Sequence, residues 1–539
     1  MAPARWVLGC GALFVGLCNA QGTFDWAVQA GGSGGSAGNA IAPDGLGGYC
    51  VAGTFYHTVM LGTTNLTVSG GGVSVRSDIF AAHMTSAGII DWAVQAGGSS
   101  FDTGRGIASD GSGGCIATGS FQGTATFGTT TLTANAASDV FVTHVTSAGV
   151  IDWAIKGGGH GTNTGYGIAA DGSGGSVVTG LFYGSATFGS FTLSSSGNSE
   201  AFVMHVTSAG VIDWAVKVGG SNQDAGRAIS PDGAGGYCVT GYSRGTATYG
   251  TTSLTSIGYD DAFVAHVTSV GGVDWAVKVG GSYSDSGSGI LGDGSGGCVA
   301  TGYFNGVGTF GTTTLTSYGG RDVFVMHVTS VGVIDWAVNA GSSETDQGYG
   351  IAPDGSGGSV VTGTFCQGQI TCTATFGNTN LTVNGGYGGR QAIFVMHVTS
   401  AGIIDSVVRA GGTSSEDFAY GIAPDASGGY GITGAFMGMA TFGTTNLTST
   451  NFPNSGSSAA CDGNQMACTA AFVFNLVPPV VPVNADSSTL NAPNTTGSVP
   501  ELSGPSPTTV APAVVQIEAG GSVRIRAGGT LEIGAVAAA

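Results

Sequence analysis

DVFVTHVTSAGVIDWAIKGG, residues 139–158, recurs in near-copies along most of the chain. Apolar and polar residues alternate in its two halves, DVFVTHV and VIDWAIK, which the tight turn Thr-Ser-Ala-Gly separates. Alternation with a period of two is typical of strands with one buried face, so this stretch predicts a β-hairpin. The Asp-Trp pair of the second half is replaced by Asp405-Ser406 in one copy and is present in six others, which begin at Asp25, Asp91, Asp152, Asp213, Asp274 and Asp335.

Four of the six steps between these aspartates are 61 residues long, and the other two are 66 and 70. A repeat of this length is one supersecondary unit. The second unit contains four strand-like segments, residues 104–110, 113–121, 139–145 and 150–156. An Asp-Gly-Ser-Gly-Gly turn joins the first two, which is a hairpin signal. Residues 124–134 predict a further small hairpin between the second and third segments.

Seven units of four antiparallel strands predict an all-β fold, a seven-bladed β-propeller of four-stranded antiparallel blades. After its first residues the chain begins with a lone fourth strand, residues 23–29, and the last unit stops after its third strand, residues 471–477. We therefore expect the N-terminal strand to complete the last blade and close the ring. In an open solenoid the first and last units do not meet, so a lone strand at one end would not complete the unit at the other end. A solenoid would instead carry distinct capping units.

The repeats also resemble the seven-bladed β-propeller repeat proteins, abbreviated SBBP. The resemblance lies in GYGIAPDGSGGSVVTG (Gly348–Gly363) and DVFVMHVTS (Asp322–Ser330), and it spans residues 23–477. It implies an exported or surface protein without a catalytic site common to the family. The chain departs from the family pattern in having histidine late in the third strand, where lysine is common.

Composition changes divide the chain into four parts. Residues 1–20 are typical of a secretory signal peptide, because Arg5 precedes a short apolar run that ends in small residues. Residues 21–477 are the propeller. Residues 478–513 are rich in Pro, Ser and Thr and read as a linker, and 514–539 are a short β-prone tail that needs a partner for stability or is a sticky, partly ordered end.

The charge balance excludes two classes of partner. The formal net charge is −19, and there are only 13 Lys and Arg residues. Binding to nucleic acid or to an anionic membrane surface requires clustered positive charge, so neither is expected. No segment of the mature chain is long and apolar enough to span a bilayer. The sequence predicts a secreted, extracellular or cell-surface protein.

Eight of the ten cysteines follow the predicted signal peptide, an even number in an exported chain. Two pairs flank insertions and predict local disulfides, Cys366 with Cys372 and Cys461 with Cys468. The other four fall in second strands of neighbouring units, offset by one residue, so that their side chains point to opposite faces. This offset predicts bonds between blades, Cys50 with Cys115 and Cys238 with Cys298; four buried free thiols are the alternative.

Glycosylation is predicted at four Asn-X-Ser/Thr sequons, Asn65, Asn380, Asn446 and Asn494. The first three occupy the same place in the small hairpin of consecutive units, so glycans there would shield one arc of the ring.

Two sets of polar residues recur in register. Six histidines fall at one position of the third strand, too far apart for a shared metal, and are interpreted as hydrogen-bonded structural residues: His83, His144, His205, His266, His327 and His397. A second set precedes the first strand of each unit and either caps turns or converges to bind Ca²⁺. Its carboxylates are Asp102, Asp224, Asp285, Asp346 and Asp417, with Asn163 and Ser36 in the remaining units. No other cofactor is predicted.

One position differs from unit to unit within an otherwise constant framework, three residues after the second set. It is occupied by Asn39, Arg105, Tyr166, Arg227, Ser288, Tyr349 and Tyr420. Arginine and tyrosine near a channel mouth suit an anionic or carbohydrate ligand, and filling between blades is the structural alternative. The Asp-Trp pairs are interpreted as packing residues, with tryptophan between blades and aspartate facing a turn.

No catalytic motif stands out from the repeat. The sequence therefore favours a binding or structural module in adhesion or matrix, with a glycan or protein at the cell surface as partner. The alternative is an extracellular enzyme that acts on polysaccharide through the channel mouth.

Overall fold

The computed structural model describes residues 23–32, 34–70, 76–220, 222–368, 371–384, 391–412, 417–449 and 470–477. Strands and turns make up these residues, and the described part of the chain has no helix that could cross a membrane. Several predictions fall outside the described residues: the signal peptide (1–20), the linker (478–513), the tail (514–539), Cys461, Cys468 and Asn494.

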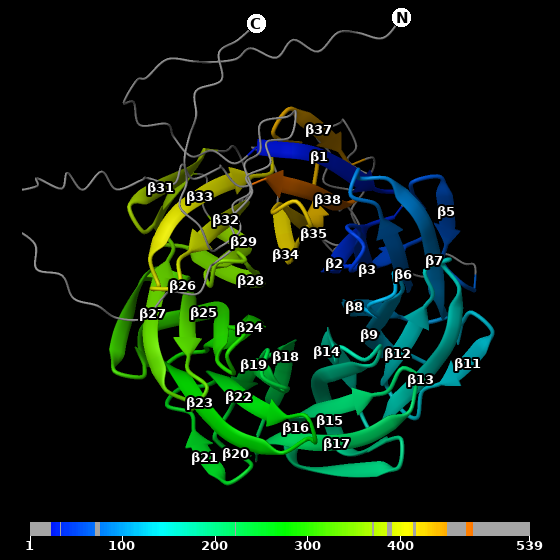
Figure 1. Ribbon diagram of the computed structural model, residues 1–539, viewed down its shortest axis with the longest axis horizontal. Helices are drawn as coiled ribbons and strands as arrows, with labels where there is room; N and C mark the ends of the chain where they lie inside the picture. The colour runs from blue at the N-terminus through cyan, green and yellow to red at the C-terminus, as the bar shows by residue number, and fades with distance from the viewer. Residues whose placement is uncertain are drawn as a thin grey trace, which may run out of the picture. The chain divides into compact units, whose positions relative to one another are not determined.

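The strands pair into antiparallel blades of four, which confirms the predicted β-propeller. Within each blade the first strand is innermost and the fourth is outermost (Figure 1). Blades 1 to 3 are β2 (Ser36–Pro43), β3 (Tyr49–Tyr56), β6 (Ser77–Met84) and β7 (Ile90–Gly98); β8 (Thr103–Ser109), β9 (Cys115–Phe121), β12 (Asp139–Val145) and β13 (Ile151–Gly159); and β14 (Thr164–Ala170), β15 (Ser176–Phe188), β16 (Phe191–Val206) and β17 (Ile212–Gly220).

The remaining four blades repeat this order. Blades 4 and 5 are β18 (Asp224–Pro231), β19 (Gly236–Ser243), β22 (Asp261–Thr268) and β23 (Val273–Gly281); and β24 (Ser286–Gly292), β25 (Cys298–Phe310), β26 (Thr313–Val328) and β27 (Ile334–Ala340). Blades 6 and 7 are β28 (Thr345–Pro353), β29 (Ser359–Gln367), β32 (Ala392–Val398) and β33 (Ile404–Ala410); and β34 (Asp417–Pro424), β35 (Tyr430–Phe436), β38 (Ala470–Val477) and β1 (Thr23–Ala30).

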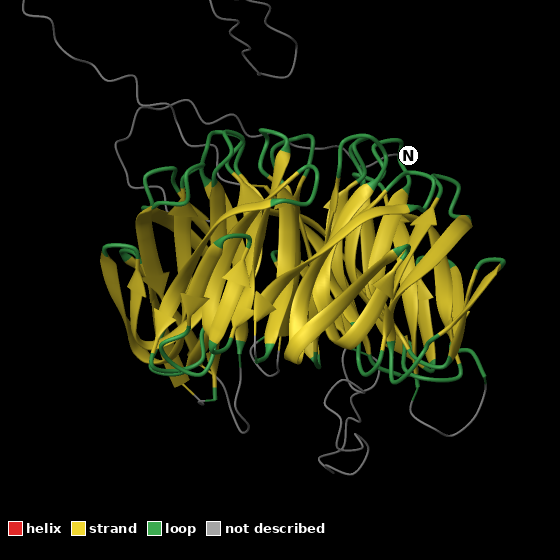
Figure 2. Ribbon diagram, turned by 90° about the horizontal axis from the view of Figure 1, so that it is seen from below, coloured by secondary structure: helices red, strands yellow, loops and turns green. Residues whose placement is uncertain are grey.

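The N-terminal strand closes the ring as predicted. β1 pairs antiparallel with β38, from Thr23 opposite Val477 to Ala30 opposite Ala471. The innermost strands contact one another in sequence, and β34 of blade 7 contacts β2 of blade 1. A closed ring leaves no blade without a neighbour on either side. The strands run between two faces at which the turns gather (Figure 2).

The small hairpins are present and also connect neighbouring blades. Five form separate strand pairs: β4 (Thr58–Leu61) with β5 (Thr64–Thr67), β10 (Thr124–Phe127) with β11 (Thr130–Thr133), β20 (Thr246–Tyr249) with β21 (Thr252–Thr255), β30 (Thr371–Phe376) with β31 (Thr379–Asn384), and β36 (Met439–Phe442) with β37 (Thr445–Thr448). In blades 3 and 5 the hairpin is continuous with the second and third strands. β10 of blade 2 pairs with β7 of blade 1, which adds backbone hydrogen bonds between blades.

Apolar residues from adjacent blades form shared clusters that hold the ring together. Within blade 2, Phe127 of the hairpin packs on Phe141 of the third strand, with 5.0 Å between the ring centroids. Both rings are fully buried. Gly119 makes room for the Phe141 ring, because a Cβ there would lie 2.9 Å from Phe141 Cε1, and it would also lie 1.9 Å from the Thr103 carbonyl oxygen of the paired strand. Truncating such a phenylalanine to alanine typically costs about 3–5 kcal/mol.

The predicted disulfides that the described residues contain are formed. Cys50 bonds to Cys115 and Cys238 to Cys298, joining blade 1 to blade 2 and blade 4 to blade 5. Cys366 bonds to Cys372 across the insertion of blade 6.

Candidate functional site

A β-bulge interrupts the innermost strand of every blade. In blade 2 the pairing passes from Gly104 directly to Gly106, so Arg105 is the extra residue. Bulges redirect a side chain that would otherwise follow the alternation of the strand. The extra residues are the seven variable ones: Asn39, Arg105, Tyr166, Arg227, Ser288, Tyr349 and Tyr420.

These seven side chains line one cavity of about 200 Å³ in the centre of the ring. All seven lie within the innermost strands and line the channel, and the position near its mouth that the sequence suggests stays a prediction. The bulges themselves were not predicted, because sequence alternation alone does not show where an extra residue is inserted.

Blades 2, 3 and 4 give one side of the channel a cationic and aromatic character. The guanidinium carbon of Arg105 lies 5.1 Å from the ring centroid of Tyr166, and that of Arg227 lies 4.5 Å from the same ring. Arg227 also lies 5.4 Å from the ring of Tyr242. Such cation–π contacts hold the two guanidinium groups close together without neutralising them.

Neither Arg105 nor Arg227 has a carboxylate partner among the described residues. The basic side chains that contact carboxylates there are the six strand histidines and Lys156, Lys217, Arg244 and Lys278. The Arg105 side chain is exposed in part, yet protein surrounds its guanidinium group. This burial, and then the nearby Arg227 charge, lower the pKa of Arg105. Arginine stays protonated in proteins, so two positive charges face the cavity.

The other side of the channel is aromatic and neutral. Tyr349 of blade 6 contacts Tyr420 of blade 7 edge to face, with 5.6 Å between the centroids, and Phe418 stacks on Tyr420. The Tyr349 hydroxyl donates to Gln347 Oε1 at 2.7 Å. Asn39 donates to the Gly104 carbonyl of the next blade at 2.7 Å. The channel therefore has two chemically different walls.

The second recurring set caps the connections that enter the innermost strands. Asp102 accepts the backbone N–H groups of Gly98, at 2.7 Å, and Gln122, at 3.0 Å. Asp224, Asp285 and Asp346 accept equivalent pairs, and Asp417 accepts the N–H of Gly412. No group of three or more His, Cys, Asp or Glu residues suited to a metal ion occurs in the described ranges. Calcium binding at these carboxylates stays a prediction.

The six histidines are structural, and each bridges two aspartates. His83 Nε2 lies 2.8 Å from Asp44 of the first turn, and its Nδ1 lies 2.7 Å from Asp91 of the Asp-Trp pair. The imidazole also stacks on Trp92, with 5.7 Å between centroids. A bulge at Asp91 directs its carboxylate toward the histidine, whereas the sequence suggested that this aspartate faces a turn. The other five histidines make the same pair of contacts.

This arrangement makes stability depend on pH. Burial would lower the pKa of His83, but its bonds to Asp44 and Asp91 outweigh burial and raise it, and the pKa of His397 is raised in the same way. A histidine whose pKa is raised by folding stabilises the folded state. This stabilisation is complete below the pKa of the unfolded state, about 6.5, and is lost as the pH rises through the pKa of the folded state. Burial raises the pKa of Asp102 to about 6 and of Asp285 to about 7, which also disfavours the folded state as pH rises.

We therefore expect a melting temperature roughly 3 °C or more higher at about pH 5.5 than at about pH 8.5. Differential scanning calorimetry of the full chain would measure it. Substituting His83→Gln and His397→Gln together should reduce the difference, because the amide does not titrate. A melting temperature that rises between the two pH values would contradict this assignment.

The three sequons within the described ranges are accessible. Asn65, Asn380 and Asn446 are exposed, each the second residue of the returning strand of a small hairpin.

These strands and their closure define a β-propeller, and comparison with known proteins adds little to that class. No family model matches the chain, and no curated protein matches it. The solved Neurospora crassa Pan2 WD40 domain is similar over 82% of this chain and 89% of its own, at 10% identity and a TM-score of 0.36. A similarity of this size carries no functional argument, and the resemblance to the SBBP family stays a prediction.

Proposed function

We propose that the protein is a secreted or cell-surface propeller that binds an extracellular ligand in its central channel and serves as an adhesion or matrix module. The observation that carries the proposal is the pair Arg105 and Arg227, which flank Tyr166 without a described carboxylate partner. Unpaired arginines in a cavity are suited to carboxylate, sulfate or phosphate groups. These two positive charges face the channel of a chain whose net charge is −19, and this contrast argues that they have a specific role.

The extracellular location is supported by three disulfides, which persist in oxidising compartments. The predicted signal peptide, the exposed sequons and the resemblance to the SBBP family favour the same location. We also propose that residues 514–539 bind a partner and thereby attach the propeller to it.

The alternative, an enzyme that acts on polysaccharide, has less support. Glycoside hydrolysis typically uses two carboxyl groups beside the scissile bond. The described residues that line the channel cavity include no carboxyl group. The carboxyls with raised pKa, such as Asp285 and Asp322, are buried in the blades. The channel chemistry thus fits binding better than hydrolysis.

A glycan array on the full secreted chain would test the proposal, with acidic and neutral glycans side by side. We expect acidic glycans to bind and Arg105→Ala/Arg227→Ala to weaken binding at least about tenfold, since each charge-assisted hydrogen bond contributes roughly 1.5–3 kcal/mol. Ser288→Ala is the matched control, because it changes a bulge residue of the same ring without removing charge. Equal binding by the arginine variant and the wild type would contradict a channel site.

A further inference from the structure

An arginine breaks the repeat within the third strand of blade 5. The position before the buried carboxyl residue of this strand is a buried serine in blades 1 to 3: Ser77, Ser138 and Ser199. Each serine hydroxyl donates to the backbone carbonyl of the capping residue that follows it in the chain. In blade 4 the position is Asp260, which pairs with Arg244 at 2.8 Å. In blade 5 it is Arg321, so a half-buried charged side chain replaces the serine of blades 1 to 3.

Arg321 lies over a tyrosine ring and carries a charge that no described carboxylate neutralises. Its guanidinium carbon lies 4.3 Å from the ring centroid of Tyr303. The lysine and arginine ion pairs of the described residues are formed by Lys156, Lys217, Arg244 and Lys278. The adjacent Asp322 is fully buried, and burial raises its pKa to about 8, so this carboxyl group is largely protonated at about pH 7. The charge of Arg321 is therefore available to a ligand.

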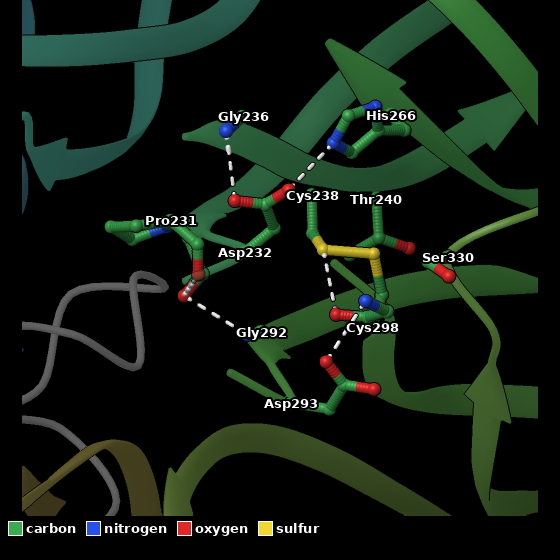
Figure 3. Close-up of a disulfide and its surroundings, with 12 residues drawn as sticks. Pro231, Asp232, Gly236, Cys238, Thr240, His266, Gly292, Asp293, Cys298 and Ser330 are labelled. Atoms are coloured by element: carbon green, nitrogen blue, oxygen red, sulfur yellow. Dashed lines mark hydrogen bonds and ion pairs between the residues drawn. A yellow bond between two sulfur atoms is a disulfide. The ribbon is translucent and has the colours of Figure 1, made fainter. Parts of the chain in front are cut away.

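Strand direction shows which way Tyr303 points. In blade 4, Cys238 of the second strand bonds to Cys298 of blade 5 (Figure 3), so one face of each second strand is directed at the next blade. In blade 5, Thr301 has this direction, because a Cβ on Gly348 of blade 6 would lie 2.4 Å from its Oγ1. Residues two apart on a strand share a face. Tyr303 therefore also faces blade 6, beside its innermost strand β28.

Arg321 also lies close to the channel lining. Tyr349 of blade 6 lines the channel cavity, and burial raises its pKa to about 12. The positive charge of Arg321 acts in the opposite direction and lowers the pKa of Tyr349, which requires that the two side chains lie near each other. The pair of Arg321 and Tyr303 thus adjoins the channel between blades 5 and 6.

An equivalent pair in blade 4 already belongs to the channel site. Tyr242 occupies in blade 4 the position of Tyr303, and the guanidinium carbon of Arg227 lies 5.4 Å from its ring. In blade 5 the residue equivalent to Arg227 is Ser288, which is too short to cover Tyr303 in this way. Tyr303 is exposed in part, and packed sheets lie about 10 Å apart. Two pairs of tyrosine and arginine therefore lie in neighbouring blades beside one channel.

We propose that Arg321 and Tyr303 form a second anionic subsite, so that the channel binds an acidic oligosaccharide with one acidic unit at Arg105 and Arg227 and another at Arg321. This inference rests on the proposed function and specifies its ligand. Guanidinium groups bind carboxylate or sulfate through paired hydrogen bonds, and tyrosine offers a sugar both an apolar ring and a hydroxyl. A separation on the order of 10 Å between subsites requires acidic groups on separate units. An acidic peptide carries similar charges but lacks sugar rings for the tyrosines.

Isothermal titration calorimetry of the full chain with acidic sugars of two lengths tests the proposal. The matched pairs are galacturonic acid with tetragalacturonic acid, and glucuronic acid with a hyaluronan hexasaccharide. We expect at least one oligosaccharide to bind at least about tenfold more tightly than its monosaccharide, because linked groups engage both subsites. Arg321→Ala should remove this gain and leave the affinity for the monosaccharide unchanged.

Three further variants separate the two subsites. Arg321→Lys should keep part of the gain, since lysine retains the charge but not the paired hydrogen bonds. Arg76→Ala removes the same charge beside the third strand of blade 1 and should leave both affinities unchanged. Arg105→Ala/Arg227→Ala should weaken the binding of both monosaccharide and oligosaccharide.

The outcomes distinguish failure of this inference from failure of the channel site. If Arg321→Ala, with an unchanged melting temperature, binds the oligosaccharide as tightly as the wild type, the second subsite is overturned and the channel site stands. If only the Arg105→Ala/Arg227→Ala variant binds as tightly as the wild type, the channel site itself is contradicted. No binding of any of these sugars at about 10 mM also overturns the inference. Equally tight binding of tetraglutamate would overturn the assignment to a saccharide.

Discussion

Deletion of residues 23–30 is expected to abolish the cooperative unfolding of the propeller. β1 is the outermost strand of blade 7, and its removal would leave the backbone groups along one edge of β38 unpaired. β1 also packs on both sides: Phe24 and Ala27 contact the cluster of blades 6 and 7, and Trp26 and Val28 contact that of blades 7 and 1. The truncated ring would lose its closure together with two apolar contacts.

Thermal unfolding followed by circular dichroism, with size-exclusion chromatography, would measure the effect. We expect a broad transition and association through the open edge, because unpaired strand edges template further pairing. A synthetic peptide of residues 23–30 should restore the sharp transition, and a scrambled peptide is its control. Trp26→Ala, a milder change, should cost about 2–3 kcal/mol, since this side chain is only partly buried. A truncated protein that melts as sharply as the full chain would refute this role.

The two disulfides between blades should contribute more stability than the local one. Cys50–Cys115 and Cys238–Cys298 close loops of 65 and 60 residues, whereas Cys366–Cys372 closes one of 6. The loss of chain entropy in the unfolded state grows with loop length, to about 4 kcal/mol for the long loops and about 2 kcal/mol for the short one.

Paired cysteine-to-alanine variants, compared by chemical denaturation, would measure these contributions. Replacing Cys238 and Cys298 should lower the free energy of unfolding by about 4 kcal/mol, and replacing Cys366 and Cys372 by about 2 kcal/mol. The short-loop variant is the matched control, because it removes the same atoms. Equal losses in both variants would show that loop closure is not the source of the stability.

The repeat made most of the fold predictable. The recurrence of Asp-Trp set the length of the unit, and the lone strand at residues 23–29 showed how the ring closes. The disulfides between blades were predictable because alternation fixes side-chain direction, so a one-residue offset between Cys50 and Cys115 turns them toward each other. Each of these inferences depends on a regular period.

What the sequence did not show depends on departures from that period. The bulge at Arg105 moves its side chain into the channel wall, and the bulge at Asp91 turns its carboxylate to His83. Both follow from strand register, which side-chain alternation does not reveal. Glycine on both sides of Arg105 was a signal, because glycine within a strand often marks a bulge.

The shared blade also sets an order of events during synthesis. β1 leaves the ribosome first, yet its partner β38 is made roughly 440 residues later, on the order of 20 to 90 s at ordinary elongation rates. The first strand must therefore stay unpaired or find substitute contacts while blades 1 to 6 form. A chain that ends early has six finished blades and no partner for β1. The ring can therefore close only after the whole propeller has been translated.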